Sequence, residues 1–245
     1  MKTVAIIPAG GAGTRMEGNL PKQYLLLGGL PILVHTLRVF QQTDLVDEIF
    51  LVLPAADLEK ARQEIVERYQ LTKVRRILPG GNKRQDSVKN GLEALDARYD
   101  IVVVHDGVRP FVSPGLVAAA VKEARRVGAV TVGVPAKDTL KTVDADGFVT
   151  ATLPREQIWL TQTPQAFQAA LLKEAYRRAR EDNYYGTDDA SLIERMGGKV
   201  KMLPGTEENI KITTPNDLTL GTFILQRRSG GCEPSAGKAT EGKGA

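Results

Sequence analysis

The chain has 245 residues, of which 42% are hydrophobic and 25% are charged, and its formal net charge is +4. This composition is typical of one large globular domain, with or without an appendage. The single cysteine, Cys232, excludes an internal disulfide framework, and with only two histidines, His35 and His105, a Cys/His zinc site is not expected. We find no signal peptide, membrane-spanning run or dense basic patch, and therefore expect a cytoplasmic protein that binds neither nucleic acid nor membrane.

Strand-like and helix-like hydrophobic patterns alternate along the first part of the chain. The strand-like apolar runs are residues 4–7, 49–53, 73–78, 101–104 and 129–134. Helical periodicity is found at residues 32–41, 57–69, 86–95 and 114–127. This alternation predicts an α/β fold with a Rossmann-like, mainly parallel sheet flanked by helices. Because ligands of such sheets bind at the carboxyl ends of strands, polar residues that follow strands are the candidates for a functional site.

The first strand-like run leads into a glycine-rich turn and two cations, in the segment VAIIPAGGAGTRMEGNLPKQY at residues 4–24. Glycines let backbone N–H groups approach an anion without Cβ atoms in the way. Arg15 and Lys22 would then meet phosphate charge at the mouth of the loop. We predict a nucleoside triphosphate site here. The alternative is an ordinary glycine turn after a strand, but such a turn has no need of two spaced cations.

Two well-known phosphate-binding loops do not match this segment. A Walker A loop requires a lysine directly after its second glycine, and Asn19 occupies that position. A dinucleotide fingerprint requires a small residue at its third glycine position, where Met16 is too large for close helix packing. A dinucleotide oxidoreductase is therefore disfavoured.

A second glycine-rich segment, GGNKRQDS at residues 80–87, follows the third strand-like run. Its spacing alone predicts a strand–helix loop in which Asp86 is the N-cap of the next helix. Ser87 would then lie in the first turn of that helix.

The segment VHDGVRP at residues 104–110 follows the fourth strand-like run. Asp106 is well placed there to hold Mg²⁺, which prefers oxygen ligands and keeps substrate phosphates in its coordination sphere. Arg109 can bind a phosphate through two of its N–H groups. The alternative is an Asp–Arg surface pair, which would contribute little. We expect a structural role for His105, because no acid–base partner is evident.

Residues 137–156 are typical of a β-hairpin, with two short strand-like runs joined by an Asp/Gly turn at residues 144–147. A lone hairpin is only marginally stable in water. We therefore expect it to pack on a second copy of the chain in a homodimer. The alternative is a surface hairpin without a partner.

Residues 158–167 are predicted to run from a strand into a helix, and the rest of the chain reads as further helices and one short strand. Thr163 suits a helix N-cap and Pro164 a first helical turn, with helical periodicity continuing at residues 168–180. Asp188 and Asp189 suit the start of another helix, where the helix dipole favours acids. A short strand is expected at residues 200–203 and a last helix from residue 214.

Several separated motifs resemble one known family. The pattern P-A-G-G-x-G-x-R-M…P-K-Q at the first loop is similar to the start of the sugar-nucleotide transferases. The motifs G-G-x-x-R-x-x-S, H-D-G-V-R-P, W-x-x-Q-T-P-Q and N-I-K-I-T-x-P-x-D resemble those of the 2-C-methyl-D-erythritol 4-phosphate cytidylyltransferases. The resemblance extends through Gln226. Asn82 departs from the aspartate that some members have at that position.

The resemblance implies a reaction and a set of partners. Members of this family transfer a cytidylyl group from CTP to 2-C-methyl-D-erythritol 4-phosphate and release pyrophosphate, in non-mevalonate isoprenoid precursor biosynthesis, with Mg²⁺. The alternatives are a cytidylyltransferase for ribitol 5-phosphate or a related polyol phosphate, and a non-catalytic nucleotide-binding regulator. The regulator would have lost Lys22 or Asp106, and both are present.

The resemblance also implies a role for particular residues. Nucleotide binding is expected of Pro8, Ala9, Gly10, Gly11, Ala12, Gly13, Arg15, Lys22, Gly81, Asn82, Ser87, Asp106 and Gly107. Substrate binding is expected of Asp106, Arg109, Thr139, Arg155, Thr163, Thr187 and Lys211. The expected catalytic residues are Arg15, Lys22, Arg155 and Lys211, and the expected metal ligand is Asp106. By this resemblance Thr139 and Arg155 would reach the pocket of a partner subunit.

We expect one nucleotidyltransferase domain at residues 1–228, with the arm at about residues 137–156. Residues 229–245 contain five glycines and no aromatic residue, and are expected to form a disordered tail.

Overall fold

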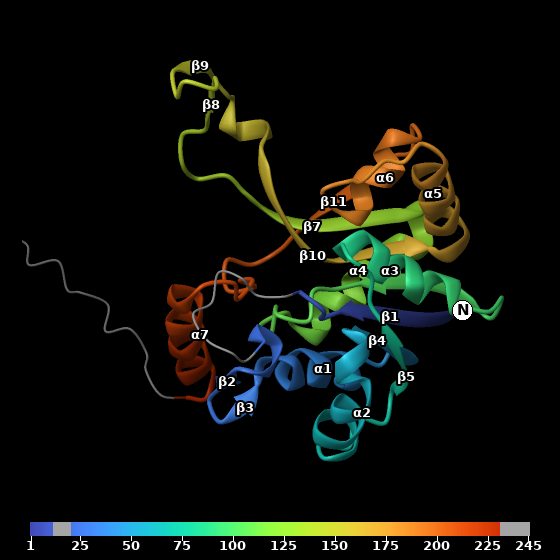
Figure 1. The fold of residues 1–245 in the computed structure, drawn as a ribbon. Coiled ribbons are helices and arrows are strands. Elements are labelled where there is room, and N and C mark those ends of the chain that lie inside the picture. The colour runs from blue at the N-terminus through green and yellow to red at the C-terminus, as the bar shows by residue number, and fades with distance from the viewer. Residues whose placement is uncertain (12–20, 231–245) are drawn as a thin grey trace, which may run out of the picture.

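The computed structural model describes residues 1–11 and 21–230, and a seven-stranded sheet forms its centre (Figure 1). Its strands, in spatial order, are β5 (Val74–Pro79), β4 (Glu48–Leu53), β1 (Lys2–Pro8), β6 (Tyr99–Val104), β10 (Trp159–Gln168), β7 (Ala129–Pro135) and β11 (Lys201–Pro204). Strand β10 is antiparallel to both of its neighbours, and all other pairs are parallel. The mainly parallel α/β sheet predicted from the sequence is thus confirmed.

Alternate residues of each strand are buried on opposite faces of the sheet, as in β1, where Ala5 and Ile7 face one helical layer and Val4 and Ile6 the other. The first layer is formed by α1 (Ile32–Gln42), α2 (Leu58–Ala61) with its π-helical continuation η3 (Arg62–Glu67), and α4 (Pro114–Val127). The second layer is formed by α3 (Arg84–Glu93), α5 (Ala169–Glu181) and α6 (Asp189–Arg195). Burial on both faces explains the near-continuous apolar strands.

The last helix, α7 (Pro215–Arg228), packs outside these layers against a two-stranded ribbon of β2 (Leu26–Leu27) and β3 (Leu30–Pro31). The capping box of α7 fixes where it begins: the Thr214 hydroxyl accepts from the N–H of Asp217, whose carboxylate accepts from the N–H of Thr214. Short 3₁₀ turns complete the helical elements, at η1 (Lys22–Tyr24), η2 (Ala55–Asp57) and η4 (Arg155–Gln157). Of the helices in the described ranges, none has the length and apolar content that crossing a bilayer requires.

The predicted hairpin is present as β8 (Lys141–Val143) and β9 (Val149–Thr152). It stands well away from the body of the molecule, on the two long connections to β7 and β10 (Figure 1). Three apolar side chains of this arm are exposed to solvent: Val143 by 59%, Phe148 by 72% and Val149 by 60%.

Two predicted helix starts are wrong. The N-cap of α3 is Lys83, and Asp86 lies three residues on, where its carboxylate accepts the N–H of Lys83 at 3.0 Å. Thr163 and Pro164 lie within β10, and α5 begins only at Ala169. The β10 backbone pairs with β6 as far as Gln168, and the register against β7 shifts between Gln162 and Ala166, where the missing N–H of Pro164 is tolerated.

Candidate active site

The first strand ends in a loop that lies beneath a lysine. After Pro8 the described part of the loop continues through Gly10 and Gly11, and a Cβ at Gly11 would lie 3.5 Å from both Cε and Nζ of Lys22. Lys22 is the first residue of the turn η1, and its ammonium lies over the loop. Ala12, Gly13 and Arg15 lie outside the described residues.

The second glycine-rich segment forms a wall opposite this loop. The Ser87 hydroxyl accepts the N–H of Gly81 at 3.1 Å and donates to the carbonyl oxygen of Lys83 at 3.3 Å. A Cβ at Gly81 would lie only 2.3 Å from the Cβ of Asp86, so only glycine lets the segment fold back onto α3. Ser87 therefore shapes the wall through its own hydrogen bonds.

The two segments enclose a hollow that we call the glycine cavity. It is lined by Pro8, Ala9, Gly10, Gly11, Lys22, Gln23, Gly81, Asn82, Lys83, Arg84, Ser87, Asp106, Val108 and Lys211. Among these described lining residues four are cationic and one, Asp106, is a carboxylate. Gly107 lies behind the loop: its N–H donates to the carbonyl oxygen of Pro8, and a Cβ there would lie 2.7 Å from that of Ala9.

A second hollow, which we call the threonine cavity, adjoins the first. It is lined by Arg84, Asp106, Arg109, Thr161, Gln162, Thr163, Gln165, Thr187, Asp188 and Lys211. Arg84, Asp106 and Lys211 line both cavities. Five residues expected to bind the second substrate, Asp106, Arg109, Thr163, Thr187 and Lys211, are thus brought together.

Asp106 is the centre of a charge cluster between the two cavities. Its Oδ1 lies 3.0 Å from Nε of Arg84, and its Oδ2 lies 2.9 Å from Nζ of Lys211 and 3.5 Å from Nε of Arg109. The carboxylate is 8% exposed. Burial alone would raise the pKa of Asp106, but the charges of Arg84, Lys211 and Arg109 outweigh it and lower the pKa below its ordinary range. Asp106 therefore stays ionised and fixes three cations.

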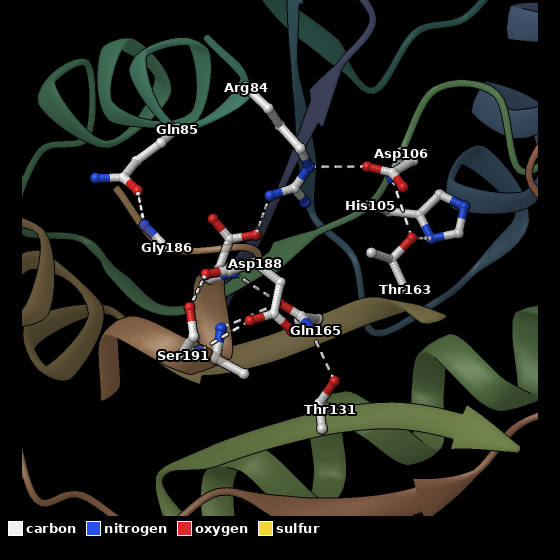
Figure 2. A network of polar contacts seen from close by, with 12 residues as sticks. Arg84, Gln85, His105, Asp106, Thr131, Thr163, Gln165, Gly186, Asp188 and Ser191 are labelled. Atoms are coloured by element: carbon white, nitrogen blue, oxygen red, sulfur yellow. Dashed lines mark hydrogen bonds and ion pairs between the residues drawn. The ribbon is translucent and has the colours of Figure 1, made fainter. Parts of the chain in front are cut away.

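The loop that carries Asp106 is held by His105 and Thr163. The Asp106 N–H donates to the Thr163 hydroxyl at 3.1 Å, and this hydroxyl lies 3.0 Å from Nδ1 of His105 (Figure 2). Nε2 of His105 lies 3.1 Å from the carbonyl oxygen of Arg109. Since a carbonyl accepts only, Nε2 carries the ring proton and Nδ1 accepts from Thr163. Burial lowers the pKa of His105 to about 4, so the ring is neutral near pH 7. The structural role expected for His105 fits these contacts.

Lys211 reaches Asp106 because its neighbours are anchored. The side chain of Asn209 is fully buried and donates to the carbonyl oxygen of Thr163 at 2.8 Å. Ile212, also fully buried, bonds through its N–H to the carbonyl oxygen of Val108 at 2.9 Å. A lysine between two apolar residues of an extended segment usually faces solvent, and anchoring on both sides turns Lys211 to the site instead.

Arg84 is the residue that the sequence analysis missed. It donates to Asp106 (Figure 2). It also donates, through Nη1, to Asp189 at 2.8 Å, and Asp189 accepts the hydroxyl of Tyr176. Gln165 completes the support, because its Oε1 accepts the N–H of Asp189 at 3.1 Å. The sequence motif could have identified it, since Arg84 is the arginine of the G-G-x-x-R-x-x-S segment. The structural reading of Asp188 and Asp189 fits, because Asp188 is the N-cap of α6 and Asp189 pairs with Arg84.

Thr139 and Arg155 lie on or next to the arm. Arg155 donates through Nη1 to the carbonyl oxygen of Lys137 at 3.0 Å, and neither Thr139 nor Arg155 is among the described residues that line the two cavities. In the part of the chain that the structure describes, no three His, Cys, Asp or Glu side chains gather as a metal site.

Fold and site together define a class of protein. A mainly parallel sheet presents a glycine turn, several cations and two adjoining cavities at the carboxyl ends of its strands. This is a nucleotide-binding α/β protein whose site suits two anionic ligands.

Comparison with known proteins gives the particular family. Residues 3–227 match the family model of 2-C-methyl-D-erythritol 4-phosphate cytidylyltransferase (IspD). The protein of that name from Syntrophus aciditrophicus is 52% identical over 94% of this chain and 98% of its own. A crystal structure of 4-diphosphocytidyl-2C-methyl-D-erythritol synthase from Anaerococcus prevotii superposes with a TM-score of 0.82 at 36% identity, covering 92% of this chain and 96% of that one. The Thermus thermophilus cytidylyltransferase gives a TM-score of 0.77 at 34% identity, covering 92% and 100%.

The chain belongs to the 2-C-methyl-D-erythritol 4-phosphate cytidylyltransferase family. It is an enzyme of the nucleotidyltransferase class, as the motifs predict, and the expected CTP-dependent reaction of isoprenoid biosynthesis is confirmed by this membership.

Proposed function

We propose that the chain joins CTP to 2-C-methyl-D-erythritol 4-phosphate where its two cavities meet. CTP would occupy the glycine cavity, and the polyol phosphate would occupy the threonine cavity. The observation that carries this proposal is that Arg84, Asp106 and Lys211 line both hollows. Substrates bound side by side would bring their phosphates together at this shared wall.

The chemistry requires positioning rather than a base. A phosphate oxygen of the polyol phosphate attacks the α-phosphorus of CTP, a new P–O bond forms, and the bond to the bridging oxygen breaks so that pyrophosphate leaves with the electron pair. The attacking phosphate is already ionised near neutral pH, so no proton must be removed from it. His105, with both ring nitrogens bonded within the protein, is not needed as a base. The rate gain would come from orientation and charge stabilisation.

Fixed positive charge would let the two anions approach. In the glycine cavity Lys22 would stabilise the α-phosphate and the departing pyrophosphate, together with Arg15, which lies outside the described residues. In the threonine cavity Arg109 and Lys211 would hold the attacking phosphate, and Thr187 would contact the polyol. Thr163 would act mainly on the loop, because its hydroxyl proton is already donated to His105.

The finer proposal for the cofactor is Mg²⁺. This ion is usually bound by one or two carboxylates together with substrate phosphates. Asp106, as a carboxylate in the glycine cavity, fits one such ligand position, with triphosphate oxygens supplying others. When bound, Mg²⁺ would neutralise charge on the leaving pyrophosphate.

We further propose a homodimer in which the arm of one subunit completes the site of the other. The support is the exposure of Val143, Phe148 and Val149 on a hairpin that stands away from its own body (Figure 1). Thr139 and Arg155 would then serve the partner's threonine cavity. We also propose that the protein is cytoplasmic and that residues 1–228 form a single domain.

Pyrophosphate release tests the function. Purified protein would be supplied with CTP and, separately, with 2-C-methyl-D-erythritol 4-phosphate or ribitol 5-phosphate, with Mg²⁺ and with a chelator. We expect turnover with the methylerythritol compound and Mg²⁺, and its loss on chelation. Faster turnover with ribitol 5-phosphate would favour the alternative polyol, and no turnover with any polyol phosphate would contradict the proposal.

A further inference from the structure

We propose that Gln85 is a positioning residue that joins the wall of the glycine cavity to the wall of the threonine cavity. This inference rests on the proposed function, in which CTP fills one cavity and the polyol phosphate fills the other. Gln85 lies in the first turn of α3, next to Arg84, and lines neither cavity itself.

The amide of Gln85 holds both sides of a loop that is distant in sequence. Its Oε1 accepts the N–H of Gly186 at 2.9 Å (Figure 2). Its Nε2 donates to the carbonyl oxygen of Tyr184 at 3.0 Å. One donor and one acceptor fix the orientation of the amide. The loop between α5 and α6 is therefore bound to α3 through two backbone groups.

The neighbours of Gln85 hold the same loop. The hydroxyl of Tyr185 donates to Oδ1 of Asp86 at 3.1 Å, and Nζ of Lys83 lies 3.6 Å from the centre of the Tyr185 ring. Lys83 lines the glycine cavity. Three residues at the start of α3, namely Lys83, Gln85 and Asp86, thus fasten one short segment to the wall that CTP would contact.

That segment leads directly into the threonine cavity. Thr187, which follows Gly186, lines this cavity, and Asp188 then caps α6 by accepting the N–H of Ser191 at 2.9 Å. Gly186 has little room to move, because a Cβ there would lie 2.3 Å from Oγ of Ser191. The position of Thr187 is consequently set on one side by α6 and on the other by Gln85.

The arrangement positions the loop before Thr187 from the start of α3. The Gln85 amide contacts this loop and not the lining of the glycine cavity. Loss of the Gln85 amide would free that loop while leaving the glycine cavity lined as before. The defect should therefore fall on the polyol phosphate and spare CTP.

Steady-state kinetics of Gln85→Met test this, because methionine keeps the length of the side chain and removes both hydrogen bonds. We expect KM for 2-C-methyl-D-erythritol 4-phosphate to rise about 10-fold, as for the misplacement of one binding group. KM for CTP should change by less than about twofold. If Gln85 only stabilised the fold, the Gln85→Met variant would contain a smaller fraction of active enzyme and its kcat would fall. The two KM values would then change alike or not at all.

Asn90→Ala is the matched control. It removes an amide-to-backbone hydrogen bond of the same helix, from Nδ2 of Asn90 to the carbonyl oxygen of Pro79 at 2.9 Å, and does not touch the 184–187 loop. Both KM values should stay at the wild-type level in this variant. A parallel rise of both KM values in Gln85→Met, or no change in either, would overturn the inference. Absence of turnover in wild type and control alike would instead contradict the proposed function.

Discussion

Lys211 and Asp106 form an ion pair, with 2.9 Å between Nζ and Oδ2, although Asp106 follows β6 and Lys211 lies just before the last helix. Arg84 and Arg109 approach the same carboxylate. One ionised aspartate thereby holds three cations, of which Arg84 and Lys211 line both cavities and Arg109 lines the threonine cavity. The carboxylate offsets the mutual repulsion of these cations, so the site can present positive charge to two anions.

Lys22→Ala should slow the chemical step. Removing one fixed charge-stabilising donor is expected to lower kcat by a factor on the order of 10²–10³. The measurement is pyrophosphate release at saturating CTP, polyol phosphate and Mg²⁺. Lys89→Ala, which removes an ammonium from α3 outside both cavities, is the control. Near-normal turnover of Lys22→Ala would refute the role given to Lys22.

Asp189→Asn should destabilise the protein and the wall of the glycine cavity. Asp189 is 1% exposed and accepts from Arg84 and Tyr176, so the substitution leaves a largely buried guanidinium with one charge partner fewer. We expect a loss of about 2 kcal/mol in the free energy of unfolding, below the range for fully buried pairs because Arg84 is 29% exposed. Urea unfolding measures it. A change within the error of the titration would show that Asp106 alone holds Arg84.

Asp217→Asn should weaken the start of α7 in a pH-dependent way. Burial alone would raise the pKa of Asp217, but hydrogen bonds from Thr213 and Thr214 outweigh it and lower the pKa. A lowered pKa means that the carboxylate adds stability above the ordinary aspartate range and loses it as pH falls through the lowered value.

The variant should therefore cost about 1 kcal/mol at pH 7, as expected for a lost helix cap. The difference between wild type and variant should shrink as pH falls below about 4. Denaturant titrations at several pH values would measure both effects. A difference that stays constant down to low pH would mean that the charge of Asp217 is not what stabilises the cap.

Two inactive variants should restore activity when mixed, if the arm serves a partner subunit. Arg155→Ala subunits keep Lys22, and Lys22→Ala subunits keep Arg155, so each mixed dimer contains one complete site. After unfolding and refolding together, about a quarter of the wild-type sites should be complete. Each variant refolded alone is the control. Activity no greater than the sum of the two controls would contradict a shared site.

The sequence by itself determined the local elements and the chemistry at strand ends. Periodicity placed α4 at residues 114–127, where the structure has it, and it predicted the hairpin at residues 137–156. These patterns are readable because burial on a helix or strand repeats with the period of that element. The glycine loop and the cluster around Asp106 were recognisable because each follows a buried strand.

Only the tertiary structure decided how these pieces meet. Thr163 reaches Asp106 because β10 runs antiparallel beside β6, and the same pairing keeps Pro164 in a strand rather than a helix. Arg84 and Gln85 gain their partners only when α3 lies against the loop before α6. Such contacts join residues far apart in the chain, and local hydrophobic periodicity carries no information about which distant surfaces pack together.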